Sequence, residues 1–304
     1  YALEKPGQKW HIHGYITLIG CYLLMMFYTT VAGWMLHYFY LTATGKFTGL
    51  DSDAVASQFN TMLSQPQVMG FWMVIIVIAG ILVCSIGLQN GLEKVTKVMM
   101  ISLLFIMVIL AINSFFMDGA KEGLSFYLIP DFERMKEIGI IKTITGAMNQ
   151  AFFTLSLGIG AMSIFGSYIG KERSLLGESL NIALLDTFVA ITSGLIIFPA
   201  CFTFHVDQTS GPGLIFITLP NIFNHIPMGK LWGSLFFIFM SFAAFSTILA
   251  VFENIISCGM ELTGWSRKKS SFINAIAIIL LSVPCVLGYN LWSSDIFAVF
   301  GGAV

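Results

Sequence analysis

Long apolar runs constrain the fold of this chain more than any other feature. Seven of them approach or exceed the ~20 residues that an α-helix needs to cross a bilayer. They are Gly14–Leu41, Gly70–Gly87, Leu92–Phe116, Thr143–Ile169, Leu180–Phe204, Leu231–Met260 and Ser271–Tyr289, and an eighth begins near Ile296. In lipid only helices and closed barrels satisfy their own backbone, and these runs lack the alternating pattern of barrel strands. We therefore expect an all-α membrane protein with about seven spans and the start of an eighth.

The composition agrees with a multi-pass membrane protein. Hydrophobic residues make up 57% of the 304 residues and charged residues 10%, whereas charged residues are ~25% of soluble domains. The lipid bilayer is the expected partner, and the net charge of −1 gives no reason to expect nucleic-acid binding. The chain starts at Tyr1 and stops within an apolar run. We interpret it as one transmembrane domain over 1–304, truncated at both ends.

The five cysteines are scattered through the apolar runs. None belongs to a CxxC motif or has the spacing of metal ligands; they are Cys21, Cys84, Cys201, Cys258 and Cys285. This pattern predicts buried small hydrophobic side chains, not disulfides.

Lysine and arginine predict the orientation, because cytoplasmic loops carry an excess of both. One set of loop ends carries Lys5, Lys9, Lys94, Lys97, Lys171, Arg173, Arg267, Lys268 and Lys269. We expect this side to be cytoplasmic in the cell inner (cytoplasmic) membrane. The segments Thr42–Met69, Met117–Lys142 and His205–Lys230 then lie outside, and each is long enough to hold short helices.

The span around Ala147–Ile169, AMNQAFFTLSLGIGAMSIFGSYI, contains in its middle residues that weaken a helix or offer oxygen atoms to a ligand. Those residues are Gln150, Thr154, Ser156, Gly158 and Gly160. Irregular backbone at membrane depth is tolerated only where it is buried in protein or lines a wet cavity, and broken helices build many midplane transport sites. The stretch therefore predicts a discontinuous helix with a binding site. A packing interface of small residues is the alternative interpretation.

Two single polar residues lie inside apolar spans. Asp186 is expensive to insert, by ~2.5–3.5 kcal/mol if ionised, so it should face the interior beside a cation or a hydrogen-bond donor. A structural hydrogen bond to a neighbouring helix is the alternative. Tyr28 needs a partner for its hydroxyl group, which is either a ligand carboxylate or another helix.

A third feature is the segment SFAAFSTILAVFEN in the sixth span. Ala243, Ser246 and Thr247 follow an i, i+3, i+4 spacing, which gathers their oxygen atoms on one helix face. Hard cations such as Na⁺ prefer oxygen ligands. Ser and Thr at this spacing also serve simply to join membrane helices, so both interpretations stay open here.

These residues resemble the neurotransmitter:sodium symporter family, and in particular its bacterial amino-acid transporters. NQAFFTLSLGIGAMSIFGSYIGKE is similar to the sixth helix of that family, GPGLIFITLP to its fourth extracellular loop, and FAAFSTILAVFEN to its eighth helix. Tyr28 and Trp34 fit the third helix. The resemblance implies an inverted-repeat transporter fold with discontinuous helices, incomplete here, running from just before the third helix into the tenth.

The resemblance also implies an activity and a set of site residues. The family couples uptake of amino acids or amines to Na⁺ by alternating access, with two sodium sites. The implied substrate contacts are Leu24, Tyr28, Val31, Phe153, Thr154, Ser156, Ile159, Thr247 and Val251. The implied sodium ligands are Thr154 and Asp186 for the first site, and Ala243, Ser246 and Thr247 for the second. Tyr28 would hold the substrate carboxylate, and Phe153 would close over the substrate.

The pocket composition and Asp186 refine the expectation. Ile159 and Val251 make the side-chain end of the pocket apolar, which favours a hydrophobic amino acid. Chloride-dependent members place an anion beside the first sodium, so the fixed charge of Asp186 favours chloride-independent transport. The third span carries Ile101 where related bacterial proteins often have a proline, which puts unwinding of that helix in doubt.

Two other functions compete with symport. A membrane sensor built on the same fold would bind substrate without moving it. A membrane-embedded enzyme would need a catalytic constellation, and the histidines form none: His11 and His13 lack further ligands, while His37, His205 and His225 are dispersed. We therefore expect a protein that is not an enzyme.

Overall fold

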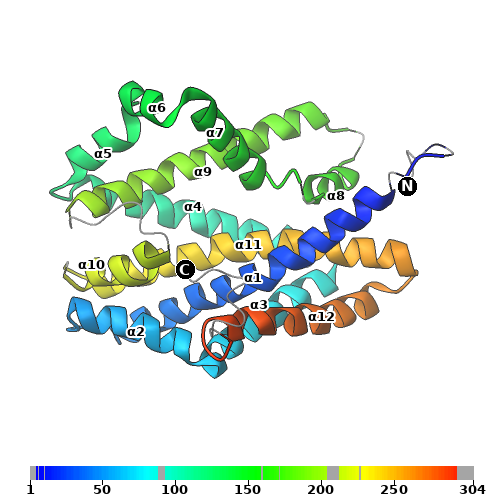
Figure 1. The fold of residues 1–304 in the computed structure, drawn as a ribbon, viewed down its shortest axis with the longest axis horizontal. Coiled ribbons are helices and arrows are strands. Elements are labelled where there is room, and N and C mark those ends of the chain that lie inside the picture. Colours follow the sequence, from blue (N-terminus) through cyan, green and yellow to red (C-terminus); the bar gives the residue numbers. More distant parts are fainter. Residues whose placement is uncertain are drawn as a thin grey trace. The chain divides into compact units, whose positions relative to one another are not determined.

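The structure, a computed structural model, describes residues 5, 7–9, 11–87, 93–158, 160–170, 172–203, 212–225 and 227–292, and these residues contain helices and no strand. The chain forms two compact units, residues 1–103 with 211–304 (unit 1) and residues 104–210 (unit 2), which are described separately. Figure 1 shows the elements. They are α1 (His11–Ala43), α2 (Ser52–Ser64), α3 (Pro66–Ile86), α4 (Lys94–Phe115), α5 (Ala120–Leu128), α6 (Phe132–Ile138), α7 (Ile140–Thr154), α8 (Ala161–Ser167), α9 (Leu175–Thr203), η2 (Leu214–Thr218), α10 (Leu219–His225), α11 (Gly229–Thr263) and α12 (Arg267–Gly288). A single domain over 1–304 stays a prediction.

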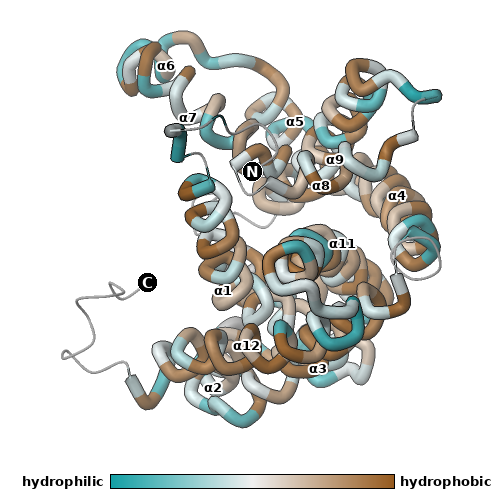
Figure 2. Tube along the Cα trace, turned by 90° about the vertical axis from the view of Figure 1, so that its right-hand side faces the viewer, coloured by the Kyte–Doolittle hydropathy of each residue, from teal (hydrophilic) through white to brown (hydrophobic). Residues whose placement is uncertain are grey.

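Six helices of the described residues are long and apolar enough to cross a membrane. They are α1, α3, α4, α9, α11 and α12, and hydrophobic residues dominate the traces of α3 and α4 in Figure 2. The remaining predicted span, Thr143–Ile169, is divided between α7 and α8. These seven predicted spans are therefore confirmed as helices, while the eighth lies outside the described residues. The helix α4, which contains Ile101, runs without a break.

Unit 1 is built around α1, α3, α11 and α12, which pack on one another, and α1 runs along α11 in Figure 1. Small residues set the spacing of these helices. A Cβ atom at Gly33 of α1 would lie 2.9 Å from the backbone nitrogen of Met73 on α3. A Cβ atom at Gly80 of α3 would lie 2.8 Å from the ring of Phe252 on α11. Membrane helices that lack larger side chains at such points can approach closely, which increases their dispersion contacts.

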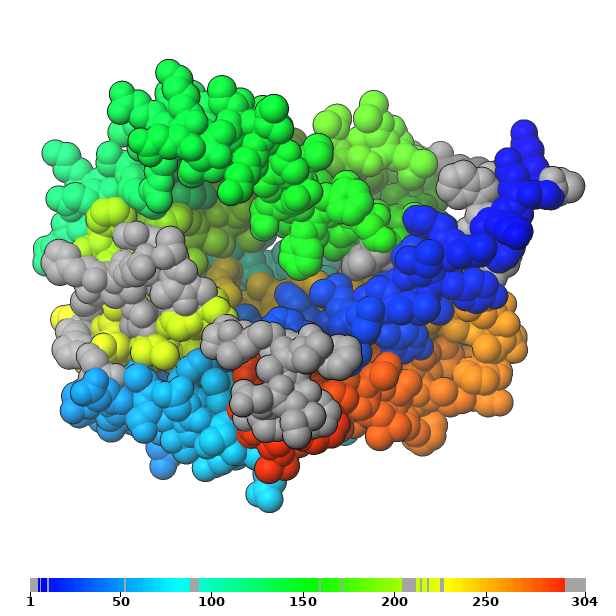
Figure 3. All heavy atoms as spheres, in the orientation of Figure 1, coloured from blue at the N-terminus to red at the C-terminus, as the bar shows by residue number. Residues whose placement is uncertain are grey.

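Aromatic rings join the short helices of unit 1 to its long helices. Phe59 of α2 and Phe216 of η2 stack with ring centroids 5.4 Å apart. Trp34 and Tyr38 of α1 each meet both rings in edge-on or near edge-on geometry, which is a favourable arrangement for aromatic pairs. Figure 3 shows α2 next to the yellow-green surface of α10. The short helices predicted for Thr42–Met69 and His205–Lys230 are therefore present, while the position of these segments outside the membrane stays a prediction.

Unit 2 contains an equally close packing of α5 against α9. A Cβ atom at Gly123 of α5 would lie 2.6 Å from the backbone of Pro199, and one at Gly194 would lie 2.1 Å from the Tyr127 ring. Tyr127 also stacks on Phe198 with centroids 4.8 Å apart. The segment Met117–Lys142 thus holds short helices, as its length predicted, and one of them, α5, packs on α9.

Candidate functional site

The predicted interruption of the 147–169 span lies between Thr154, where α7 ends, and Ala161, where α8 begins. Ser156 has a φ of 53° and Gly160 a φ of 75°, so both adopt left-handed conformations that cannot continue a right-handed helix. The amide of Ser156 bonds to the carbonyl of Phe153 at 3.0 Å, which tightens the last turn of α7. The break interrupts the backbone hydrogen bonds between residues i and i−4. It also leaves the two half-helices with free ends that carry partial charges.

The break carries a direct polar contact to α9. The Thr154 hydroxyl group donates a hydrogen bond of 3.0 Å to Oδ1 of Asp186. Both residues belong to unit 2. Carboxylate, hydroxyl and carbonyl oxygens together are the donor set that hard cations prefer. The structure thus brings together the two residues predicted for the first sodium site, and it also matches the alternative of a helix-to-helix hydrogen bond.

A second group of oxygen atoms lies on α11 in unit 1. The hydroxyl groups of Ser246 and Thr247 lie 2.8 and 3.5 Å from the carbonyl oxygen of Ala243. The predicted gathering on one helix face is therefore present. Hydroxyl groups bonded back onto a helix carbonyl are also common inside membrane helices, so ligation of a second sodium ion by these residues stays a prediction.

The predicted substrate residues of unit 1 lie on α1 and α11. Leu24, Tyr28 and Val31 share one face of α1, because residues spaced by three, four and seven lie above one another. The Tyr28 hydroxyl group lies close to the side chain of Thr247 on α11, and Val251 is fully buried on α11. This proximity fits the helix-to-helix partner that the sequence left open as one of two possibilities.

The other predicted substrate residues belong to unit 2. Phe153 stands in the last turn of α7 and is 64% exposed within the described chain, and Ser156 lies in the break itself. Ile159 lies outside the described residues. The roles of these residues and of those on α1 and α11 toward one substrate stay predictions.

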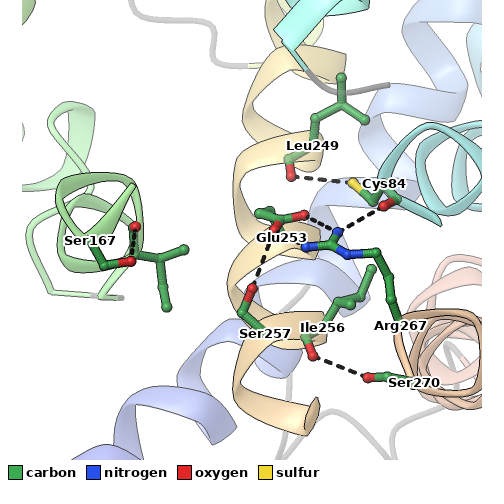
Figure 4. Close-up of polar contacts among 9 residues, drawn as sticks. Cys84, Ser167, Leu249, Glu253, Ile256, Ser257, Arg267 and Ser270 are labelled. Carbon is green, nitrogen blue, oxygen red and sulfur yellow. Dashed lines mark hydrogen bonds and ion pairs between the residues drawn. The ribbon is translucent and has the colours of Figure 1, made fainter. Parts of the chain in front are cut away.

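One buried ion pair was missed from the sequence. Glu253 of α11 is fully buried, and both of its carboxylate oxygens accept bonds from Arg267, at 2.7 and 2.9 Å. Arg267 also donates to the carbonyl of Cys84 at 2.9 Å, and Ser257 donates to the same carboxylate at 3.2 Å. Figure 4 shows the guanidinium group between Glu253 and the end of α3. The one signal of this pair in the sequence is Glu253, an acidic residue in an apolar run.

Comparisons with known proteins place these features in a family. The model of the sodium:neurotransmitter symporter family matches residues 52–300. An uncharacterized sodium-dependent transporter of Bacillus subtilis is 33% identical over 96% of this chain and 64% of its own length. One of Haemophilus influenzae is 30% identical over 98% of this chain and 65% of its own length.

A solved structure of similar sequence has the same fold. MhsT in complex with L-phenylalanine has a TM-score of 0.85 and 35% sequence identity, and the match covers 95% of this chain and 65% of MhsT. This chain therefore spans just under two thirds of the relatives that it matches. The predicted discontinuous-helix transporter fold is confirmed by this match and by the break between α7 and α8. On the family match and these relatives, the chain belongs to the sodium:neurotransmitter symporter family.

Proposed function

We propose that the complete protein is a sodium-coupled symporter of a hydrophobic amino acid in the cell inner membrane, and that it works by alternating access. The observation that carries the proposal is the contact between Thr154 and Asp186, which sets a carboxylate beside a broken membrane helix. Such a break supplies free carbonyl groups and half-helix ends, both of which suit an alkali cation and a zwitterion. The sodium-dependent relatives support the coupling ion.

Each predicted group of sodium ligands lies within one unit of the chain. Thr154 and Asp186 of unit 2 form the proposed first site, and the oxygens of Ala243, Ser246 and Thr247 of unit 1 form part of the second. A carboxylate in the first site balances the ion's charge, which is the basis for proposing that no chloride is needed.

The substrate class follows from the side chains on α1 and α11. Leu24, Val31 and Val251 are apolar, whereas Tyr28 offers a hydroxyl group to a carboxylate. An apolar pocket favours hydrophobic over charged side chains because it gives a charged side chain no partner. MhsT, whose structure holds L-phenylalanine, gives independent support for an amino acid of this class. Nothing in these residues supports an enzymatic reaction.

The direct test is amino-acid binding to the purified full-length protein with and without Na⁺. We expect scintillation-proximity signals for leucine, phenylalanine, tryptophan or tyrosine that exceed those for glycine and that disappear when K⁺ replaces Na⁺. Counterflow of the bound amino acid in proteoliposomes then separates a carrier from a sensor. Binding that is indifferent to Na⁺ would overturn the proposed coupling, and binding without counterflow would indicate the sensor.

A further inference from the structure

Two cysteines of unit 1 meet at a single amide group. Nδ2 of Asn254 donates to the sulfur of Cys21 at 3.3 Å, and the sulfur of Cys258 donates to Oδ1 of the same asparagine at 3.5 Å. Cys21 comes from α1, whereas Asn254 and Cys258 stand one turn apart on α11. Neither cysteine forms a disulfide, so one interface between two helices brings together two reduced sulfur atoms.

The pair has an approach from one side. A cavity of about 580 Å³ is lined by Gly14, Tyr15, Leu18, Cys258, Glu261 and Leu262. Cys258 is half-buried and borders this cavity, while Cys21 is fully buried and is reached through the amide group of Asn254. Glu261 also lines this partly open cavity, and an acidic group in a cleft raises the local concentration of cations.

The donor set selects the kind of ion. Sulfur ligands are soft and favour soft metals. In the described part of the chain, no three His, Cys, Asp or Glu side chains gather around one point, so zinc would lack its usual four ligands there. An ion that prefers linear coordination by two thiolate sulfurs needs no ligand beyond this pair. A divalent ion also leaves the site neutral, which matters because an uncompensated buried charge is costly.

We propose that Cys21 and Cys258 form a binding site for a soft divalent cation of the mercuric class. On binding, each thiol loses its proton to water in the cavity, the two S–H bonds are replaced by two S–metal bonds, and the metal keeps its oxidation state. The amide of Asn254 must leave the space between the sulfur atoms. The site has no counterpart among the proposed sodium and substrate residues.

The position of the pair links it to the substrate residues of the proposed function. Tyr28 lies seven residues after Cys21, and Thr247 lies seven residues before Asn254. Seven residues are about two helical turns, or ~10.5 Å, so the Cys21–Asn254 and Tyr28–Thr247 contacts follow each other along the same interface. An ion that displaces Asn254 disturbs this interface, and we expect it to weaken amino-acid binding.

The first measurement is the amount of metal bound, which does not depend on transport. The full-length protein is prepared with its cysteines replaced by alanine except Cys21 and Cys258, and it is loaded with Hg²⁺ and dialysed against an excess of a monothiol. A single thiol gives its mercury up to the monothiol, whereas a prepositioned pair retains it. We expect one retained ion per protein and X-ray absorption that shows two sulfur neighbours.

The controls separate the pair from ordinary thiol chemistry. Either Cys21→Ala or Cys258→Ala in this background should abolish the retained ion. A matched protein that keeps Cys201 and Cys285 instead, which lie on different helices, should retain none. Retention by the single-cysteine variants, or equal retention by the control protein, would overturn the site. Variants that fail to fold are identified by size-exclusion chromatography and replaced by the serine variants.

The second measurement tests the link to the substrate residues and rests on the proposed function. Hg²⁺ should inhibit Na⁺-dependent amino-acid binding, and Cys258→Ala should raise the inhibitory concentration at least ~10-fold, the lower end of what losing one supporting group costs a metal site. A protein that retains the ion yet binds amino acid normally would refute the link alone. A protein that binds no amino acid under any condition would refute the proposed function while leaving the metal measurement intact.

Discussion

At the scale of single residues, a variant of Asp186 tests whether this residue is a sodium ligand or only the hydrogen-bond partner of Thr154. Asp186→Asn keeps an oxygen that can accept the 3.0 Å bond from Thr154 but removes the negative charge. If the carboxylate binds Na⁺, its loss weakens the Coulomb attraction, and we expect the Na⁺ concentration for half-maximal binding to rise by at least ~10-fold, or about 1.4 kcal/mol. The measurement is amino-acid binding as a function of Na⁺.

The matched control for Asp186 is Glu178 on the same helix. Glu178 forms an exposed ion pair with Arg173 at 3.1 Å, with a glutamate side chain that is 30% exposed. Glu178→Gln removes the same charge from the first turn of α9, eight residues before Asp186, and should leave the Na⁺ dependence unchanged. If Asp186→Asn behaves like Glu178→Gln, Asp186 serves only to join α7 to α9.

Asp186 could be predicted as a candidate site residue because an acidic residue inside an apolar run is costly in a membrane wherever it lies. The sequence alone is enough to find such a residue. Glu253 carries the same signal, yet its partner could not be predicted. Arg267 lies 14 residues away at the start of the next helix, and only the packing of α11, α12 and the end of α3 brings the two together. Patterns locate costly residues, whereas their partners depend on tertiary structure.

At the scale of elements, the broken helix was the most predictable feature. Glycine and hydroxyl residues in the middle of a membrane span act locally, so the break at 155–160 follows from the sequence. The close approaches at Gly33 and Gly123 were not predictable, because a glycine reveals a close contact only once its opposite helix is known. The first turn of α7, which starts at Ile140 and not at Thr143, shows that ends are set by flanking residues such as Gly139.

The ion pair of Glu253 and Arg267 should hold α3, α11 and α12 together. Arg267→Ala leaves a fully buried carboxylate without its partner and also removes the bond to the Cys84 carbonyl. Removing one member of a buried pair costs about 3–5 kcal/mol, because the remaining charge stays desolvated. We expect a clear loss of thermal stability of the full-length protein in detergent, and partial rescue by the double variant Glu253→Gln, Arg267→Met.

The exposed pair of unit 2 provides the comparison. Arg173 is 64% exposed and pairs with Glu178, and a pair of this kind contributes about 0–1 kcal/mol. Arg173→Ala should therefore leave the melting temperature almost unchanged. Equal melting temperatures for Arg267→Ala and Arg173→Ala would mean that water enters around Glu253 and that the ion pair of Glu253 and Arg267 contributes little to stability.

At the scale of the whole molecule, the question is how the charge of a sodium ion in the proposed first site would be balanced. Inside a membrane a cation needs a nearby negative charge, which either the protein or a mobile anion provides. Asp186 lies inside α9 and accepts a hydrogen bond from the end of α7, so its carboxylate would be a countercharge held in place beside the break. On the proposed function, we expect that the first site needs no external anion.

Uptake by the complete protein in proteoliposomes should therefore continue when gluconate replaces chloride on both sides at constant Na⁺. Asp186→Asn turns this into a two-sided test, because the variant lacks the fixed charge while keeping the oxygen toward Thr154. We expect the variant to recover part of its uptake when chloride is added and the parent protein to gain nothing. Parent uptake that stops in gluconate would show that a mobile anion does what we assign to Asp186, and the fixed-charge account would have to be given up.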